Sequence, residues 1–237
     1  MRSMILFSKE TMTKVQTIPK DLRPPPLERG LFSPHDGIST SPPPLIGPGD
    51  RCKIYRNKFH HNNEDFHNNA ELALFGLIPS WACDARSATQ NCVVHVADVV
   101  NKPAYRTALF NAQFCWISVY YFLGSVWKEG REHPVRIERA DQQPLLLAGI
   151  WSEWVLNSAT TLLSFCLLTR DNDSQLKAYG VRICQGKSQC FAFLSSSNLL
   201  KCLDHPYQKA IETLANTNPP DLRVTPHTST HRPINVT

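Results

Sequence analysis

Residues 114–123 constrain the fold more than any other part of the sequence. This run is apolar and aromatic, and residues that favour β-structure, such as Val, Ile, Tyr, Phe and Trp, dominate it. A membrane-spanning helix needs about 18 or more consecutive apolar residues, so the run is too short to cross a bilayer as a helix. Its length and composition instead predict a buried β-strand.

Other segments show the patterns of further strands and of short helices. Residues 135–138 alternate with period two, as a half-exposed strand does, and Pro103 begins a predicted helix that continues to Phe110. Further strands are predicted over 145–154, 162–169 and 190–194, and helices over 198–203, capped by Ser197, and from Pro206, with Tyr207, Ile211 and Leu214 on one face. Strands dominate and the helices are few, which predicts an α+β fold with a mainly antiparallel, barrel-like sheet.

The chain divides into an arm, one domain and a tail. Residues 1–50 are rich in proline, which is excluded from helix interiors and central strands, so they predict an irregular N-terminal arm. Residues 51–217 have the length and apolar content of a single domain, with a polar surface loop at 59–69. Residues 218–237 predict a polar, frayed C-terminal tail.

Composition and charge narrow the functional classes only moderately. The net charge of +5 permits a nucleic-acid partner without requiring one. No apolar stretch is long enough for a membrane helix, and the amino terminus lacks the apolar core of a signal peptide, so we expect a cytoplasmic protein without membrane association. The eight cysteines form no CxxC pair, which favours small buried side chains over zinc ligands.

One histidine-rich segment is a candidate metal site. His60, His61 and His67 lie close to Glu64 and Asp65, and such side chains can bind zinc or nickel. No fixed scaffold is evident around them, which favours a hydrated loop. The sequence also has no phosphate-binding glycine loop. We therefore expect neither a metal nor a cofactor.

Five segments stand in order along the chain and share a pattern with one known family. They are residues 74–81 (LFGLIPSW), 102–106 (KPAYR), 114–117 (FCWI), 147–154 (LAGIWSEW) and 164–169 (SFCLLT). In that order they resemble WGLIPSW, KPAFR, RCLIP, AGLWExW and SFTILT of the SRAP family, the SOS-response-associated peptidases that process abasic sites in DNA. No single segment is specific, but five at plausible spacing make the resemblance strong.

The resemblance implies an SRAP-like barrel and a role in the DNA damage (SOS) response. Family members bind single-stranded DNA and attack the ring-opened aldehyde of an abasic site with a cysteine at position 2, which is exposed when the initiator methionine is removed. The amine and thiol of that cysteine close a thiazolidine ring, which gives a DNA–protein crosslink. An Asn positions the cysteine, and a Glu and a His handle protons.

The positions that would hold the nucleophile and its positioning residue carry other side chains. Position 2 is Arg2, and a bulky second residue also hinders removal of the initiator methionine. Counting back from Lys102 places the family's Asn on Val93 and its neighbouring Arg on His95. Val93 has no hydrogen-bonding side chain. Asn91 is the alternative if the register slips by two residues.

The proton-handling positions are changed as well. Counting on from Cys115 in the third segment places the family's Glu near Gly124. Glu129 and Glu132 are near but lie in a charged turn, where hydrated glutamates are the norm. The family's His falls within 178–184, which contains no histidine, and Arg182 there is a poor general base. We assign no catalytic residue and predict a pseudoenzyme or the product of a decaying gene.

Four residues are predicted to contact DNA, and single-stranded or abasic DNA is the predicted partner. Trp81 and Phe75 carry rings on which unpaired bases can stack, although either can instead belong to the core. Lys102 and Arg106 are either phosphate contacts or hydrated charges. One alternative is an inactive remnant or interaction module whose proline-rich arm docks on a protein. Another alternative retains the amine of Met1, which can form a reversible imine with the aldehyde.

Overall fold

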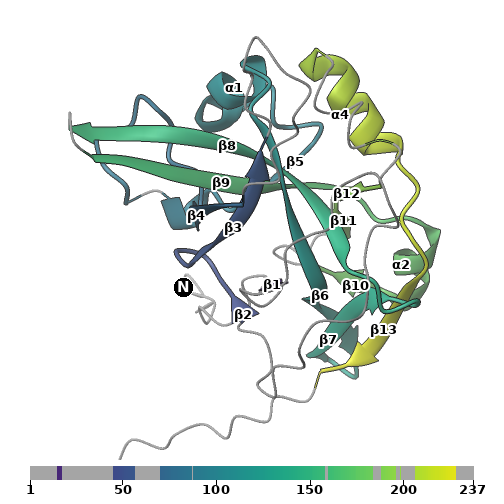
Figure 1. Cartoon of the computed structure of the whole chain (residues 1–237). Helices are drawn as coiled ribbons and strands as arrows, with labels where there is room; N and C mark the ends of the chain where they lie inside the picture. Colours follow the sequence, from purple (N-terminus) through teal and green to yellow (C-terminus); the bar gives the residue numbers. More distant parts are fainter. Residues whose placement is uncertain are drawn as a thin grey trace, which may run out of the picture.

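The structure, a computed structural model, describes residues 15–17, 45–56, 70–86, 88–157, 160–183, 188–195, 198 and 206–227. Within these ranges the strands join into one large sheet with helices at its margins (Figure 1). The strands are β1 (Val15–Thr17), β2 (Leu45–Ile46), β3 (Arg51–Arg56), β4 (Glu71–Phe75), β5 (Val93–His95), β6 (Phe114–Lys128), β7 (Arg131–Arg139), β8 (Leu145–Asn157), β9 (Thr160–Asp171), β10 (Val181–Arg182), β11 (Gln189–Phe191), β12 (Phe193–Leu194) and β13 (Leu222–Pro226).

Five of these strands close into a barrel, which confirms the predicted architecture. β6 pairs with β8, β8 with β9, and β3 with both β4 and β6, and all four pairings are antiparallel. A parallel pairing of β4 with β9, with Leu74 opposite Ser164, completes the circle. The sheet is therefore mainly antiparallel, as predicted, and closure leaves these five strands without a continuous free edge.

The described helices are α1 (Pro103–Phe110), α2 (Ser174–Tyr179) and α4 (Tyr207–Asn216). α1 begins at Pro103 as predicted, because the first helical residue needs no N–H partner. The sequence patterns did not predict α2, which is capped by Asp173 through a 2.7 Å bond from Leu176 N–H. The helix predicted over 198–203 lies outside the described residues apart from Asn198. None of the helices in the described ranges is long and apolar enough to cross a membrane.

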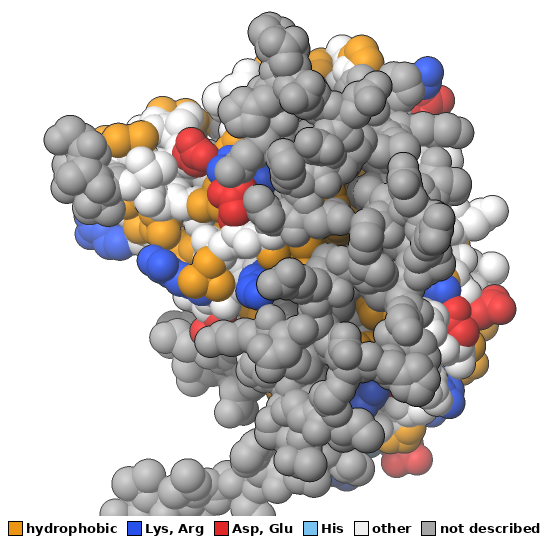
Figure 2. All heavy atoms as spheres, in the orientation of Figure 1, with side chains coloured by type: hydrophobic (Ala, Val, Ile, Leu, Met, Phe, Trp, Pro, Cys, Tyr) orange, Lys and Arg blue, Asp and Glu red, His pale blue; other side chains and the backbone are white. Residues whose placement is uncertain are grey.

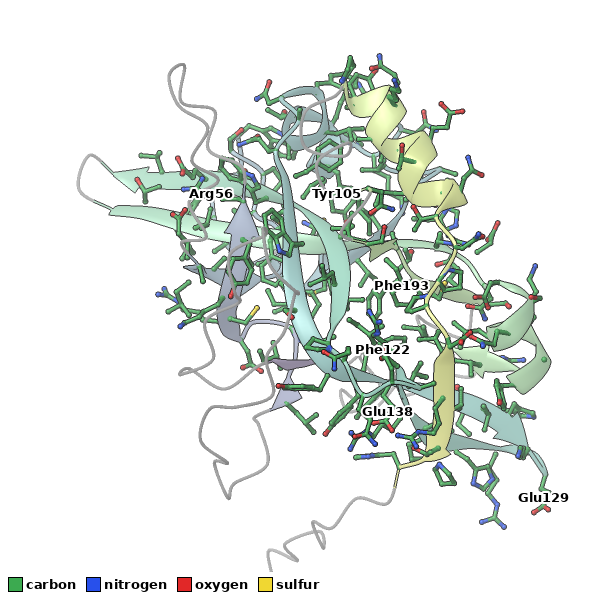
Figure 3. All side chains as sticks on the ribbon, turned by 45° about the vertical axis from the view of Figure 1, so that its right-hand side comes forward. Arg56, Tyr105, Phe122, Glu129, Glu138 and Phe193 are labelled. Atoms are coloured by element: carbon green, nitrogen blue, oxygen red, sulfur yellow. The ribbon has the colours of Figure 1, made fainter. Side chains whose placement is uncertain are left out.

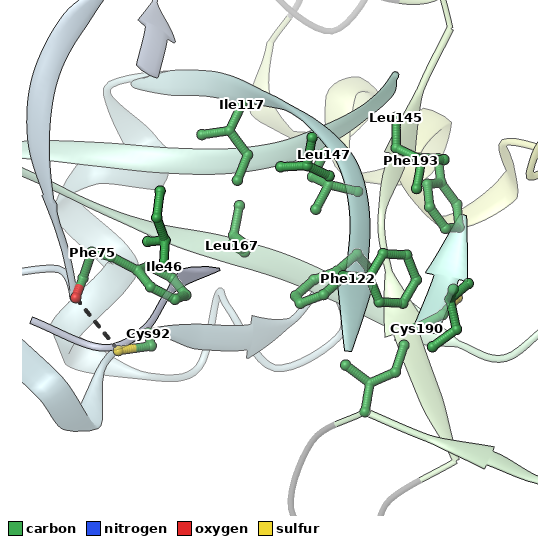
Figure 4. Packing of buried hydrophobic residues seen from close by; sticks show 14 of the residues in the cluster. Ile46, Phe75, Cys92, Ile117, Phe122, Leu145, Leu147, Leu167, Cys190 and Phe193 are labelled. Carbon is green, nitrogen blue, oxygen red and sulfur yellow. Dashed lines mark hydrogen bonds between the residues drawn. The ribbon is translucent and has the colours of Figure 1, made fainter. Parts of the chain in front are cut away.

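Two main apolar clusters lie on opposite sides of the barrel wall. The inner cluster fills the barrel and extends along the inner side of β6 and β7. The outer cluster lies where α1 and α4 pack against the outside of the barrel. In the inner cluster Phe122 meets the ring of Phe191 edge-on, with centroids 5.1 Å apart. Figure 4 shows Phe122 and Phe193 among the buried side chains of this cluster. Leu214 is buried in the outer cluster beside Tyr207 and Ile211, which confirms the predicted apolar face of α4.

β6 changes partners along its length, and a β-bulge marks the change. Up to Val119 it pairs with β8, and from Tyr121 onward it pairs with β7. Its register with β1 shifts there, because Val15 faces Phe122 whereas Thr17 faces Val119. Before the bulge the odd-numbered residues enter the inner cluster, and after it the even-numbered residues do. The bulge therefore sets which side chains of the second half of β6 face inward.

Three strands fall where the sequence predicts irregular chain. The prediction of a frayed tail is wrong for β13, which pairs with β7 from Leu222 opposite Arg139 to Pro226 opposite Val135. Leu222 and Val224 contact the inner cluster, so apolar burial offsets the entropy of ordering this segment. β1 and β2 pair with each other within the predicted arm. Most of the arm and the loop at 59–69 lie outside the described residues.

Candidate functional site

Two of the positions aligned with the family's reactive residues meet at one edge of the sheet. Gly124 lies on β6 next to β10, which pairs Arg182 with Ser125. A Cβ atom on Gly124 would lie 2.9 Å from Ile137 Cδ1, 3.1 Å from Arg182 O and 3.3 Å from Val181 Cγ1. The segment that carries the family's His is therefore adjacent to the position of its Glu, as the resemblance implies.

This meeting point is an apolar wall. Val181 and Ile137 are buried in the inner cluster, and Val93 on β5 packs against the same cluster. None of these side chains has a group that can carry a proton or hold a thiol in place. Val93 and Gly124 therefore supply packing at positions where the resemblance predicts reactive groups.

Asn91 does not replace the missing asparagine. Its amide donates to Leu77 O at 3.2 Å, and its Oδ1 accepts from the Tyr105 hydroxyl at 3.4 Å. Both partners belong to the outer cluster, whereas Val93 contacts the inner one. The register slip that would place Asn91 in the site is therefore wrong, because β5 begins at Val93 and Asn91 is held on the other side of the wall.

The nearby glutamates do not reach the aligned position either. Glu132 lies on β7 and accepts a 3.2 Å hydrogen bond from Ser125 Oγ. Ser125 and Gly124 are consecutive in a strand, so their side-chain directions point to opposite faces of the sheet. Glu129 lies at the hairpin tip (Figure 3). Both glutamates are exposed, which agrees with hydrated charges in a turn.

His95, which aligns with the family's Arg, has contacts at both ring nitrogens. Nδ1 accepts from Ala97 N–H at 3.2 Å, so the proton of the neutral ring lies on Nε2. Nε2 is 3.4 Å from Asp171 Oδ1, an ion-pair distance, although the angles fall short of a hydrogen bond. Both ring nitrogens of His95 therefore face groups of the chain itself.

Phe75, one of the four predicted DNA contacts, belongs to the core. Its side chain is fully buried, and its ring stacks on Phe165 with centroids 5.2 Å apart. No face of the ring is left for a base, so the predicted contact is corrected to a packing role. Trp81, six residues further on, is 62% exposed and keeps its ring available.

The two predicted cations extend from the start of α1. Lys102 is exposed and lies 3.8 Å from Asp98 Oδ2, and Arg106 is exposed and donates to Val100 O at 3.2 Å. A surface ion pair of this kind contributes little free energy and leaves the ammonium accessible. Phosphate contact by Lys102 and Arg106 therefore stays a prediction.

A groove beside the Trp81 segment is a feature that the sequence analysis missed. Trp154 on β8 lines it and also donates to Ala82 O at 2.7 Å, which ties the segment to the groove. Basic and hydrophobic side chains lie side by side on this part of the surface (Figure 2). The groove has a volume of about 430 Å³ and is lined by Arg51, Glu71, Leu72, Trp154, Thr161, Leu162 and Leu163.

The buried cysteines offer no substitute for a cysteine at position 2. Burial raises the pKa of Cys52 and Cys92 to about 12, and it raises the pKa of Cys115 and Cys166 well above the usual value. The thiolate is the nucleophile, so these thiols are unreactive at neutral pH. In the described part of the chain no three His, Cys, Asp or Glu side chains cluster as metal ligands. The histidine-rich segment at 60–67 lies outside it.

Restoring the family's glutamate by Gly124→Glu is expected to destabilise the protein by roughly 1–3 kcal/mol. The new Cβ would press on Arg182 O and Ile137 Cδ1, and the carboxylate would face apolar side chains. Urea unfolding measures the loss, and Gly124→Ala separates the steric part from the charge. A glutamate variant as stable as the parent would show that this edge is open rather than packed.

Comparison with known proteins agrees with the fold. A family model described as SOS response associated peptidase (SRAP) matches residues 34–209, which is well over half of the chain. No curated protein matches the sequence.

Three solved structures are similar in fold. A protein from Bordetella bronchiseptica superposes with a TM-score of 0.72 at 17% identity, over 92% of this chain and 100% of its own. A protein from Bacteroides thetaiotaomicron gives 0.61 at 17% identity, over 74% and 73%. A phage-related protein from B. bronchiseptica gives 0.56 at 14% identity, over 83% and 86%. The family match, the closed barrel and the adjacency of Gly124 on β6 to β10 all agree, and the chain belongs to the SRAP family.

Proposed function

We propose that this chain is a single-stranded-DNA-binding member of the family that does not form the abasic-site crosslink. The observation that carries the proposal is that two of the aligned positions, Val93 and Gly124, lie against the apolar inner cluster, while the third, Arg182, is an exposed cation. A protein that loses the chemistry can still keep a binding surface, because binding and bond formation rest on different residues.

The loss of chemistry follows from what ring closure requires. A thiazolidine needs an amine and a thiol on one residue, and Arg2 supplies no thiol. The aldehyde also needs a proton carrier, and neither Val93 nor Gly124 has an ionisable group. The described thiols inside the barrel, such as Cys115, are part of the chain interior and lack a free amine, so they cannot close the ring.

Binding to single-stranded DNA rests on the exposed ring of Trp81 and on the groove beside it. A base stacked on an exposed aromatic ring contributes about 1–3 kcal/mol in any sequence context. Arg51 in the groove and Lys102 and Arg106 on α1 supply positive charge for phosphates. Stacking combined with phosphate contact is the usual way to bind single strands without sequence preference.

We expect the full chain to bind a single-stranded oligonucleotide at low salt, with or without an abasic site, and to leave no covalent adduct. Trp81→Ala should weaken binding roughly fivefold to hundredfold, because one stacked base is lost. Fluorescence anisotropy measures the affinity, and a denaturing gel detects adducts. Tyr179→Ala, which removes an exposed aromatic ring from α2, is the matched control.

Two outcomes would overturn the proposal. Failure to bind either oligonucleotide at low salt, where phosphate contacts are strongest, would remove the DNA-binding role. A stable adduct on abasic DNA would show that the crosslinking chemistry survives. An adduct that appears only after borohydride reduction would instead identify a reversible imine at the amine of Met1.

A further inference from the structure

We propose that the outward face of β10, β6, β7 and β13 is a second contact surface for single-stranded nucleic acid. This inference rests on the proposed function and extends it to a surface distinct from Trp81 and its groove. The four strands lie side by side in that order, paired from Arg182 opposite Ser125 to Arg223 opposite Glu138. We call this surface the outer face.

The β-bulge in β6 determines which side chains of this strand point to the outer face. Past the bulge, even-numbered residues of β6 enter the inner cluster, so Ser125 and Trp127 point outward. Trp127 is 55% exposed, and Arg182 on β10 is exposed beside it. The described helices pack elsewhere, since α2 contributes Leu176 to the inner cluster and α1 and α4 cover the outer cluster.

Two arginines on this face are held in place by one buried carboxylate. Glu138, whose side chain is 12% exposed, accepts from Arg223 Nε and Nη2 at 3.0 and 2.7 Å. Its other oxygen lies 2.5 Å from Arg136 Nη2. Two guanidinium groups share one negative charge, so the cluster carries a net positive charge. Figure 3 shows Glu138 where β7 and β13 run together.

The arginines keep hydrogen-bonding capacity toward solvent. The side chains of Arg136 and Arg223 are 41% and 47% exposed, and Arg136 lies over the ring of Tyr121 at 3.9 Å. Arg136 Nε is itself buried, so the capacity toward solvent lies in the exposed ends of the two guanidinium groups. An arginine already fixed by a carboxylate and a ring loses less entropy when it binds a phosphate than a free side chain does.

The spacing of the charges suits an extended polyanion. Neighbouring strands lie about 4.8 Å apart, so Arg182 on β10 and Arg223 on β13 are about 14 Å apart across the strands, and the four residues from Pro134 to Glu138 add about 13 Å along them. Trp127 projects from β6 next to Arg182, with the guanidinium carbon 6.0 Å from the ring centroid. A sheet face with an exposed aromatic ring and flanking arginines matches the chemistry of bases and phosphates in a single strand.

The test compares variants of the full chain for binding to a labelled thymidine oligonucleotide of about 15 nucleotides, a length within the usual reach of such surfaces. Trp127→Ala should weaken binding roughly fivefold to hundredfold. The double variant R182Q/R223Q should reduce the slope of log affinity against log salt by about 1.4, since each lost phosphate contact removes about 0.7. Glutamine at 223 can still donate to Glu138, and thermal melting verifies folding.

The matched control is Arg139→Gln. Arg139 lies on β7 opposite Leu222, which belongs to the inner cluster, so this arginine is on the face of β7 opposite to the outer face. It should leave the slope unchanged. If the wild type binds and Trp81→Ala weakens it, but the outer-face variants behave like Arg139→Gln, this inference fails and the proposed function stands. If the wild type binds no single strand at low salt, the proposed function fails and takes the outer face with it.

Discussion

Gly76→Ala should lower the free energy of unfolding by about 3–5 kcal/mol, a large share of the stability of an ordinary domain. Gly76 directly follows β4 and has φ of +134°, a conformation that residues with a side chain rarely adopt. A Cβ atom there would lie 2.4 Å from Ala88 O and 2.7 Å from Ala88 C. Those are backbone atoms, so no side-chain rotation relieves the clash.

The backbone around Gly76 has little room to move away. Gly76 N donates to Phe165 O at 2.9 Å, and Leu77 N donates to Asn91 O at 3.0 Å, which ties this turn to β9 and to the segment before β5. Shifting Gly76 to admit a methyl group would therefore break bonds to two other parts of the sheet. Denaturant unfolding monitored by tryptophan fluorescence measures the cost.

Gly130→Ala provides the matched control for Gly76→Ala. Gly130 also has a positive φ, of +76°, but a Cβ atom there would meet nothing within 4 Å. Its replacement should cost only about 1–2 kcal/mol, which is the backbone term alone. Equal losses at the two glycines would show that the close approach to Ala88 contributes nothing.

The strands and helices with strong local patterns could be predicted from the sequence. Residue type alone predicts the strand at 114–123, the period-two segment in β7 and the start of α1 at Pro103. β13 could not be predicted in this way, because it is short and much of its stability comes from backbone pairing with β7. Local sequence patterns do not predict the parallel pairing of β4 with β9 either, since it joins segments that are distant in sequence.

The residue types at the aligned positions can be read from the sequence, whereas their geometry cannot. That Val93 and Gly124 carry no ionisable group is visible in the sequence itself. The role of Phe75 did not follow, because it depends on which face of β4 its side chain occupies. In β6 a bulge reverses the alternation of inward and outward side chains, and a bulge cannot be recognised reliably in a single sequence. The outer face with Trp127 became visible only with the strand pairing.

Arg56→Met should destabilise the protein by about 3 kcal/mol, the lower part of the range for breaking a buried ion pair. Arg56 ends β3 at the mouth of the barrel, and its side chain is 8% exposed. It makes two 2.9 Å bonds to Glu71 and one 2.8 Å bond to Glu153, and its guanidinium lies 4.1 Å from the centroid of the Trp151 ring. Burial lowers the pKa of Arg56, but hydrogen bonds to the two glutamates outweigh that effect and raise it.

The cost arises mainly from the two glutamates that lose their partner. Their side chains are 27% and 46% exposed, so water recovers part of the lost interaction, and the estimate is therefore kept at about 3 rather than 5 kcal/mol. The triple variant R56M/E71Q/E153Q removes the unpaired charges together and should regain at least about 1 kcal/mol relative to Arg56→Met. Urea unfolding distinguishes the two cases. A triple variant no more stable than Arg56→Met would mean that the arginine acts through packing on Trp151 and not through its charge.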